Sequence, residues 1–249
     1  MAIVTGGSGG IGLGVGRLLV ARGYDVVLTA RTESTLGAAA GEIGARWAAG
    51  DSADPAAAAR VVAEAGRVDL VVHAAGVMAG TFVRNESVET FADVLRTNLT
   101  SAFVVAHAAL PAMGAGGRMI FLSSTSAHAA QPGRSAYSAS KAGLNAFAAA
   151  LAREVERDGI GVHVVTTGPV DTPMLDDVRF PMRTLGVAEV AEAVVWLDSL
   201  PGNVVLPEIR LSSVDQGPFA PEPVVPPTAR RLGRTELPGE DAPGVVADI

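Results

Sequence analysis

The chain has 249 residues, 49% of them hydrophobic, and a formal net charge of −7, so it can bury one large α/β core or two small ones. It has no cysteine, its four histidines lack metal-ligand spacing and only 4% of its residues are aromatic, which excludes disulfides and thiolate chemistry and argues against metal and nucleic-acid sites. No secretory signal precedes the first strand and no apolar run reaches the ~18 residues of a membrane span, so we expect a cytoplasmic protein.

The first element is a short strand at residues 2–5 that runs into a glycine-rich turn and then a helix. Two glycine registers fit, Gly7-x-Gly9-x-x-Gly12 and Thr5-Gly6-x-x-x-Gly10-x-Gly12. Glycines allow a tight turn and close backbone approach, and the helix N-terminus offers unpaired N–H groups to a pyrophosphate. The alternative is a purely structural turn. We predict a dinucleotide cradle with contacts from Gly6, Ser8, Gly10, Ile11 and Gly12.

The second predicted strand, residues 25–29, ends in Ala30-Arg31-Thr32. NAD-binding units usually carry an Asp or Glu near this point to hold the ribose 2′-hydroxyl. Here the carboxylate is missing, and Arg31 offers a guanidinium that suits a 2′-phosphate. We therefore predict NADP(H), bound by Arg31 and Thr32, with a solvated arginine as the alternative. Asp51 follows a presumed third strand and is predicted to meet the adenine edge.

A helix is predicted near residues 55–65 and a strand at 68–73, which ends at Ala74-Ala75-Gly76. His73, at the strand end, is interpreted as a structural hydrogen-bonding residue and not as an acid or base. A long helix is expected from residue 87 to about 113. Asn98 lies in its middle, where an amide is unfavourable unless something uses it.

The chemistry is predicted where an apolar strand at residues 119–122 ends in Ser123-Ser124, because ligands bind at the carboxyl edge of open α/β sheets. Tyr137 and Lys141 follow at the start of a helix, four residues apart and so on one face. A lysine beside a tyrosine favours the phenolate and suits the phenol to acid–base catalysis. The pair alone also fits an ordinary helix start with a surface lysine.

The helix after Tyr137 has an apolar stripe that is predicted to face the core. Its opposite side is predicted to carry alanines, which suit close packing against another subunit. The stripe is Leu144, Phe147, Leu151 and Val155, and the alanines are Ala148, Ala149 and Ala152. A sixth strand follows near residues 160–165, with His163 as a core residue. A helix at 187–200 precedes the last strand, 204–211, an edge strand because Pro207 cannot donate to a ladder.

The composition changes near Asp215, after which seven prolines are mixed with glycines and charged residues. We predict one domain at residues 1–213 and a Pro-rich tail at 214–249. The tail is expected to be extended or disordered, or to be an arm that wraps a neighbouring subunit.

With these motifs in order, the chain resembles the short-chain dehydrogenase/reductase family over about residues 1–213. The matching segments are Thr5-Gly-x-x-x-Gly-Ile-Gly12, His73-Ala-Ala-Gly76, Asn98, Ser124, Tyr137-x-x-x-Lys141 and Gly168-Pro-Val-Asp-Thr-Pro173. Ser124 precedes Tyr137 by 13 positions (137 − 124), the usual family spacing. His73-Ala74 replaces the pair of asparagines that normally braces the sheet in this family, and Thr167 stands where the family usually has a Pro before Gly168. The resemblance implies a single Rossmann-type, doubly wound parallel sheet of about seven strands with helices on both faces.

The resemblance also implies residue roles and an activity, the interconversion of a carbonyl and a secondary alcohol with NADP(H). Tyr137 would be the general acid or base, Lys141 would hold the nicotinamide ribose and depress the Tyr137 pKa, and Ser124 would bind the substrate oxygen. Asn98 would order a water in a proton relay to Lys141. Ala75, Gly76, Val170 and Thr172 would contact the cofactor, the last two at the carboxamide and pyrophosphate. Because relatives usually pair through the Tyr137 helix, we expect a homodimer or homotetramer.

Substrate information is expected after Thr172, in a short segment that suggests a small or open site. Val178-Arg-Phe180 and the region after Trp196 look similar to the serine/3-hydroxy acid dehydrogenase branch, so Arg179 is a candidate for a substrate carboxylate. An unspecified ketone, aldehyde or secondary alcohol is the other reading. A non-catalytic NADP-binding sensor of the same fold is the alternative from another class, and the intact set Asn98, Ser124, Tyr137 and Lys141 argues against it.

Overall fold

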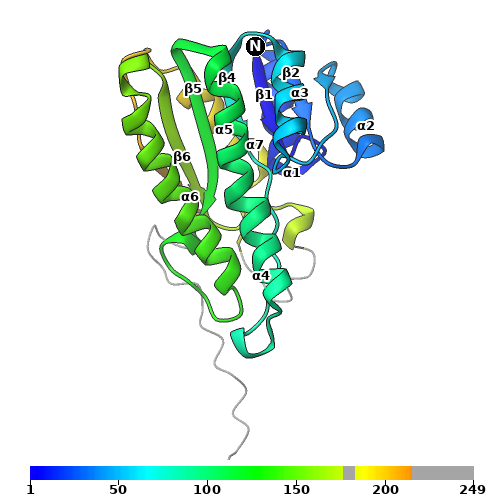
Figure 1. Ribbon diagram of the computed structural model, residues 1–249, viewed down its shortest axis with the longest axis vertical. Helices are drawn as coiled ribbons and strands as arrows, with labels where there is room; N and C mark the ends of the chain where they lie inside the picture. The colour runs from blue at the N-terminus through cyan, green and yellow to red at the C-terminus, as the bar shows by residue number, and fades with distance from the viewer. Residues whose placement is uncertain (176–182, 215–249) are drawn as a thin grey trace, which may run out of the picture.

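The computed structural model describes residues 1–175 and 183–214. Seven parallel strands form one sheet in the order β3-β2-β1-β4-β5-β6-β7 (Figure 1). Their bounds are β1 Ala2–Thr5, β2 Val26–Thr29, β3 Arg46–Trp47, β4 Val68–His73, β5 Met113–Ser124, β6 Gly161–Thr167 and β7 Glu208–Leu211. The predicted doubly wound parallel sheet of about seven strands is confirmed, and so is the edge position of the last strand.

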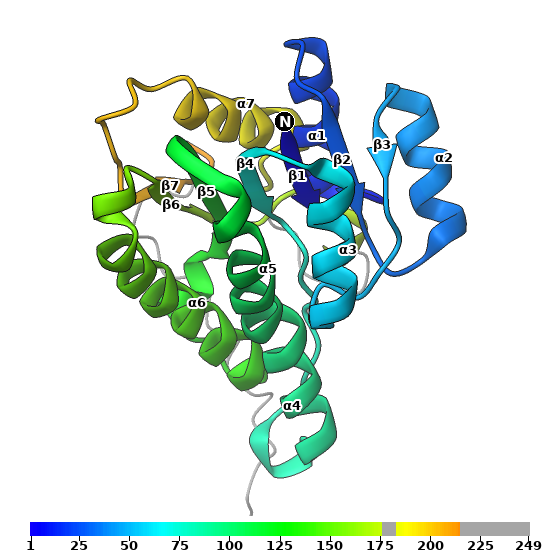
Figure 2. The same ribbon diagram turned by 45° about the horizontal axis from the view of Figure 1, so that its top comes forward.

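Helices cover both faces of the sheet, as Figures 1 and 2 show. The helices are α1 Gly10–Ala21, α2 Glu33–Ile43, α3 Pro55–Ala65, α4 Val88–Leu95, α5 Ser101–Ala109, α6 Ser135–Glu154 and α7 Val187–Asp198. Successive strand residues point to opposite faces: in β1, Val4 packs with α1, α2 and α7, whereas Ile3 packs with α3, α5 and α6. Both faces are therefore hydrophobic cores, which is why the strands read as nearly continuous apolar runs.

The long helix predicted from residue 87 to about 113 is built from four consecutive segments. A π-helical turn, Arg96–Thr100, joins α4 to α5, and a 3₁₀ turn follows at Leu110–Ala112. The Ser87 hydroxyl accepts a hydrogen bond from the Thr90 N–H and caps the start. A π turn displaces the backbone locally and is frequent at functional sites. Asn98 lies inside this turn.

One face of α6 differs from the prediction. Leu144, Leu151 and Val155 are buried as expected and Phe147 is partly buried, but Ala148 is also buried and belongs to the core between α6 and the sheet. Its assignment to the outer face was wrong, because positions 144, 148, 151 and 155 follow one helical stripe at spacings of four, three and four. Ala149 is exposed, and Ala152 is partly buried against the same core.

Two boundaries of the predicted elements differ in the structure. The last helix ends at Asp198 and not at residue 200, and β7 begins at Glu208 and not at 204. The turn between them is held by Arg118, a buried cation that the sequence did not single out. Its guanidinium donates to the carbonyls of Leu200, Pro201 and Val204 and contacts the Nε2 of His163. His163 is fully buried, as predicted for a core residue, and burial lowers its pKa.

Within the two described segments, no helix combines the length and the apolar character that crossing a bilayer requires. The predicted tail, apart from Val214, lies outside the described residues.

His73 braces the sheet at the point where the strand order reverses between β1 and β4. Thr5 Oγ1 accepts hydrogen bonds from the backbone N–H groups of residues 74–75 and lies 3.1 Å from His73 Nδ1. Ser101 Oγ donates to the Thr97 carbonyl and lies 3.1 Å from His73 Nε2. Because the Ser101 proton is already used, His73 Nε2 must donate to Ser101 and Nδ1 must accept from Thr5. The ring is therefore a neutral structural group, consistent with its predicted role.

This brace makes the fold sensitive to acid. Burial, with a smaller contribution from the charge of Lys141, lowers the pKa of His73 from 6.5 to about 3. The unfolded chain binds a proton at His73 near pH 6.5, whereas the folded chain binds it only near pH 3. The contribution of neutral His73 to the free energy of unfolding is therefore fully present above pH 6.5 and is lost as the pH falls towards 3. The expected slope from this group is about 1.4 kcal/mol per pH unit.

We therefore expect His73→Asn to lower the free energy of unfolding at pH 8, through lost hydrogen bonds, and to flatten its dependence on pH between 6 and 4. Urea unfolding at several pH values measures both effects. His107→Asn is the matched control, because His107 is exposed, and it should keep the wild-type slope. Equal slopes for wild type and His73→Asn would contradict the assignment.

Candidate active site

A cavity of about 420 Å³ opens at the carboxyl edge of the sheet and is lined by the segments that follow β1 to β6. Its volume lies in the usual range for small-molecule sites. The predicted site residues, Asn98 excepted, line it: Gly6, Ser8, Gly10, Ile11, Gly12, Arg31, Thr32, Asp51, Ala75, Gly76, Ser124, Tyr137, Lys141, Val170 and Thr172. The structure thus brings together residues that are distant in sequence. No group of three or more described His, Asp or Glu side chains could hold a metal ion.

At two positions of the glycine turn, Gly6 and Gly12, a side chain would collide with neighbouring backbone. Gly6 has a φ of +67°, and a Cβ on it would lie 3.0 Å from the backbone of residues 74–75. A Cβ on Gly12 would lie 2.3 Å from the Gly6 carbonyl oxygen. The first turn of α1 has no side-chain cap and no acidic residue, so its N–H groups and positive dipole end face the cavity without a protein anion. This arrangement fits a pyrophosphate.

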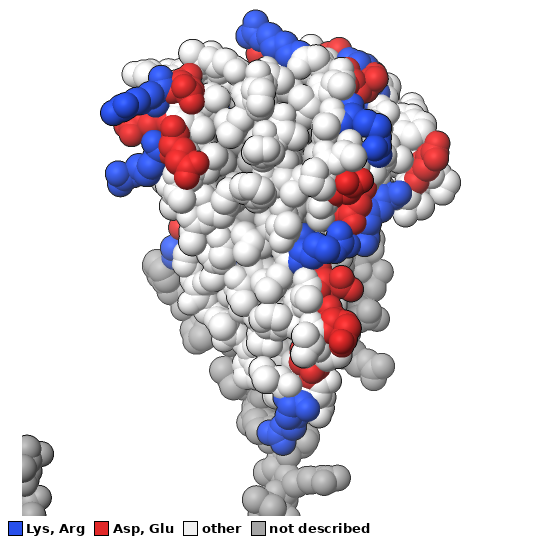
Figure 3. Space-filling model, viewed as in Figure 1, with Lys and Arg blue, Asp and Glu red and all other residues white. Residues whose placement is uncertain are grey.

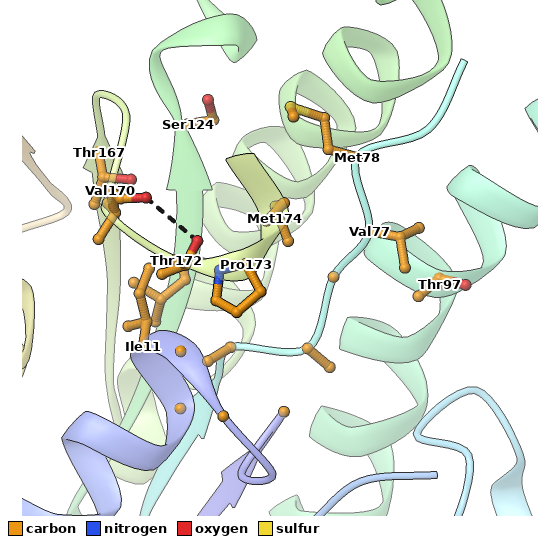
Figure 4. A pocket seen from close by; sticks show the side chains of 18 of the residues that line it. Ile11, Val77, Met78, Thr97, Ser124, Thr167, Val170, Thr172, Pro173 and Met174 are labelled. Atoms are coloured by element: carbon orange, nitrogen blue, oxygen red, sulfur yellow. Dashed lines mark hydrogen bonds between the residues drawn. The ribbon is translucent and has the colours of Figure 1, made fainter. Parts of the chain in front are cut away.

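The segment after β6 closes the cradle from the other side. Figure 4 shows Ile11 of α1 close to Thr172 and Pro173. Thr172 Oγ1 donates to the Val170 carbonyl at 3.3 Å, and Val170 forms a bridge with Leu185, which ties this segment to the chain just before α7. Arg179, the predicted carboxylate partner, falls outside the described residues.

Arg31 and Asp51 lie at the β2–β3 side of the cavity. Asp51 accepts from the Ala53 N–H and pairs with Arg96 at 2.6 Å. Partial burial opposes its ionisation, but the Ala53 N–H, Arg96 and the charge of Arg31 together lower the pKa of Asp51. Arg31 itself is exposed and has no ion pair within the described part of the chain. Its guanidinium is therefore available to an anionic ligand.

Tyr137 and Lys141 occupy the first two turns of α6, and both side chains are buried. Lys141 Nζ lies 5.9 Å from the centre of the Tyr137 ring and donates to the Leu122 carbonyl at 2.8 Å. Burial lowers the pKa of Lys141 to about 8, so the ammonium is still charged at neutral pH. The Leu122 bond uses one of its three donors. A Cβ on Gly76 would lie 3.6 Å from Nζ, so this glycine leaves space beside the ammonium.

Ser124 ends β5 and lines the same cavity (Figure 4). Its Oγ accepts a hydrogen bond from the Ser126 N–H at 3.2 Å. That bond orients the hydroxyl oxygen and leaves its proton able to donate to a ligand oxygen.

Asn98 is fully buried behind the cavity and does not line it. Its Nδ2 donates to the Val77 carbonyl and to Ser140 Oγ, both at 2.9 Å, and its Oδ1 accepts from the Val77 N–H at 2.7 Å. Ser140 in turn donates to the Tyr137 carbonyl at 2.7 Å. Asn98 thus connects the π turn, the β4 loop and the first turn of α6. Both Nδ2 donors of Asn98 are used by protein groups. The water predicted at Asn98 stays a prediction.

Sequence reasoning missed Arg134, a guanidinium that lines the same cavity as Tyr137. The available signal was a cation directly before the helix that carries Tyr137. It also missed Ser140, which becomes informative only once Asn98 is known to reach it.

Comparison with known proteins settles the family. The family model described as short chain dehydrogenase matches residues 1–182. The chain belongs to the short-chain dehydrogenase/reductase family. This oxidoreductase is 36% identical over 218 residues to the 3-oxoacyl-(acyl-carrier-protein) reductase FabG of Escherichia coli, an alignment that covers 80% of the chain and 89% of FabG.

Two other members of this family extend the comparison. An acetoacetyl-CoA reductase of Acinetobacter is 34% identical over 232 residues, with 84% of this chain and 94% of the relative covered. A short-chain dehydrogenase of Burkholderia cenocepacia, solved in complex with NADP, superposes with a TM-score of 0.77 at 30% identity. That superposition covers 85% of this chain and 94% of the other.

Proposed function

We propose that this short-chain dehydrogenase/reductase uses NADPH to reduce the ketone of a 3-oxoacyl compound to a secondary alcohol, and catalyses the reverse oxidation with NADP⁺. The observation that carries the proposal is the convergence of Ser124, Tyr137 and Lys141 in the cavity that also contains the glycine cradle. The two curated relatives support the substrate class, because both are named for the reduction of a 3-oxoacyl group. The complete set of polar groups favours an enzyme over a sensor.

NADP(H) fits the residues present. The α1 N-terminus and the glycines would hold the pyrophosphate, Arg31 and Thr32 the 2′-phosphate, and Lys141 the nicotinamide ribose. Ala75, Gly76, Val170 and Thr172 would complete the contacts, with Asp51 at the adenine end. Bound NADPH supplies the hydride that reduces the carbonyl carbon.

The chain's own residues supply the proton and fix the substrate. Tyr137 donates its phenolic proton to the developing alkoxide oxygen, and the Ser124 hydroxyl donates a hydrogen bond to the same oxygen. The Lys141 ammonium, charged below pH 8, stabilises the tyrosinate that remains. Asn98 and Ser140 hold the first turn of α6, and hence Tyr137, in place.

The test is a spectrophotometric screen of NADPH oxidation with 3-oxoacyl thioesters, 3-oxo esters, simple ketones and aldehydes. We expect 3-oxoacyl compounds to have the highest kcat/KM. An enzyme that binds NADPH but oxidises it with none of these carbonyls would support the sensor instead. A clear preference for simple aldehydes or ketones would retain the reaction and overturn the substrate class.

The face formed by α5 and α6 is the proposed contact with a second copy of the chain. Phe103 on α5 is 52% exposed, stacks on His107 and meets Phe147 of α6 edge-on at 6.2 Å between ring centres. The exposed positions of α6 include the small residues Ala142, Ala146, Ala149 and Ala150. Figure 3 shows few charged side chains over the middle of this face. Small, uncharged surfaces allow two helices to approach closely.

We therefore expect Phe103→Asp to convert the assembly into monomers at micromolar concentration, because a carboxylate would be buried without a partner. Light scattering coupled to size-exclusion chromatography measures the mass. Phe82→Asp is the matched control, since Phe82 is 54% exposed but precedes α4 and lies on neither α5 nor α6. An unchanged mass for Phe103→Asp would exclude this face.

A further inference from the structure

Arg134 is the charged residue of the cavity that the proposed chemistry leaves without a role. Among residues 1–175 and 183–214, four charged side chains line the cavity, namely Arg31, Asp51, Arg134 and Lys141. Asp51 is paired with Arg96, Arg31 serves the cofactor phosphate, and Lys141 lies beneath Tyr137. Of the described charged residues in the lining, Arg134 is the one left without a role.

The position of Arg134 sets where its charge acts. It is the residue before α6 begins, three positions before Tyr137, and both side chains line the cavity. Arg31, by contrast, follows β2, which β1 and β4 separate from β5. Three strand spacings correspond to about 14 Å. The two arginines therefore act on different parts of a bound complex, one at the 2′-phosphate and one near the reacting carbonyl.

Arg134 makes a weak hydrogen bond to Met78 and keeps further N–H donors for a ligand. Its side chain is partly buried, and one terminal nitrogen donates to the sulfur of Met78 at 3.1 Å. A thioether is a weak acceptor, whereas a guanidinium has five donors arranged to grip a carboxylate through two parallel bonds. No carboxylate in residues 1–175 and 183–214 pairs with it: the acidic groups that form ion pairs there, Asp51 among them, have other partners. A partly desolvated cation in this state attracts an anion from solution.

Several other side chains of the cavity lining are apolar. Figure 4 labels Val77, Met78, Pro173 and Met174 among them, and Leu175 also lines the cavity. An apolar wall with one cation fits a short carbon chain that ends in a negative charge. It fits a neutral thioester or ester less well, since neither offers a charged oxygen to the guanidinium.

We infer that Arg134 selects substrates that carry a carboxylate a few bonds from the reacting ketone, so that the preferred 3-oxoacyl compound is the free 3-oxo acid and not its thioester. The inference rests on the proposed function and names the form of its substrate. In the bound state, the ketone oxygen faces Tyr137 and Ser124, and the carboxylate accepts two hydrogen bonds from Arg134. The reverse reaction oxidises the matching 3-hydroxy acid.

The test compares three substrates with one carbon skeleton: acetoacetate, its methyl ester and its N-acetylcysteamine thioester. In the wild type, acetoacetate should have the highest kcat/KM. Arg134→Gln should lower the acid-to-ester ratio of kcat/KM about 100-fold, mainly through KM for the acid, because a bidentate charge-assisted pair is lost. Arg134→Lys should recover part of the ratio. Arg153→Gln, the same change on an exposed arginine of α6 away from the cavity, should leave the ratio as it is.

A binding measurement gives a readout that does not depend on turnover. In the Tyr137→Phe background with NADP⁺ bound, acetoacetate should bind by calorimetry, and adding Arg134→Gln should weaken that binding by a similar factor.

Several outcomes would overturn the inference. Equal losses for acid, ester and thioester, with a shifted pH profile, would assign Arg134 to the phenol of Tyr137. A wild-type preference for the thioester would place the anion elsewhere while leaving the proposed function intact. If NADPH is oxidised with no 3-oxoacyl compound, the proposed function fails. If the ester is reduced and the acid is not, the proposed function stands and the inference about Arg134 fails.

Discussion

Replacing Tyr137 by phenylalanine is expected to lower kcat by about 10³-fold or more while changing the dissociation constant of NADPH by less than about threefold. The substitution removes one oxygen atom, and with it the proton that the alkoxide must receive. The ring stays, so the buried first turn of α6 keeps its packing and the contact with Lys141. Because the proton is needed only in the transition state, the loss should fall on kcat and leave cofactor binding nearly unchanged.

The matched control is the other tyrosine of the chain, Tyr24. It donates a short hydrogen bond to Asp198, which lies at the end of α7, and does not line the cavity. Burial and the neighbouring Asp198 carboxylate raise the pKa of Tyr24 to about 12, so it stays protonated over the assay range. Tyr24→Phe should reduce stability slightly and retain turnover. Steady-state kinetics and NADPH fluorescence titration on both variants decide the question, and near-wild-type kcat for Tyr137→Phe would refute the proposed mechanism.

Replacing Arg31 by aspartate should reverse the cofactor preference. The variant loses a charge-assisted pair with the 2′-phosphate and places a carboxylate where a ribose 2′-hydroxyl can donate to it. A bond of this kind contributes about 1.5–3 kcal/mol, so kcat/KM for NADPH should fall about 10- to 100-fold, and repulsion of the phosphate adds to the loss. In the same variant, kcat/KM for NADH should rise.

Arg31 is a favourable position for this test because it is exposed and the described structure gives it no ion pair to break. Its replacement should therefore lower stability only slightly, through repulsion between the new carboxylate and Asp51. Arg157→Asp, at an exposed position outside the cavity, controls for the change in net charge. Parallel kinetics with NADPH and NADH measure the preference, and an unchanged ratio in Arg31→Asp would assign the 2′-phosphate to another residue.

Much of the candidate cofactor site could be predicted from the sequence because its requirements are local. A strand, a turn and a helix follow one another within residues 2–21, and two of the glycines, Gly6 and Gly12, are required by close contacts with neighbouring backbone. Arg31 was found for the same reason, since it immediately follows β2. The four-residue spacing of Tyr137 and Lys141 needs only the geometry of one helix to place both on one face.

The tertiary structure decided the features that depend on contacts between distant segments. Spacing alone does not reveal that Asn98 reaches Ser140, that Asp51 is paired with Arg96, or that the buried Arg118 closes the turn after α7. The same holds for Ala148, whose core position depends on which side of α6 meets the sheet.

The sequence by itself therefore determined the fold class, the cofactor cradle and the candidate proton donor. The cradle follows from the steric limits of a short backbone segment, whereas the fold class and the role of Tyr137 are what the resemblance of these motifs to the short-chain dehydrogenase/reductase family implies. Only the tertiary structure showed that Asn98 lies behind the cavity, that His73 is a neutral brace and that Arg134 is a cation without a carboxylate partner among the described residues. The reason is physical: whether a polar group is free to act on a ligand depends on burial and on its partners, and folding brings both from segments far apart in the chain.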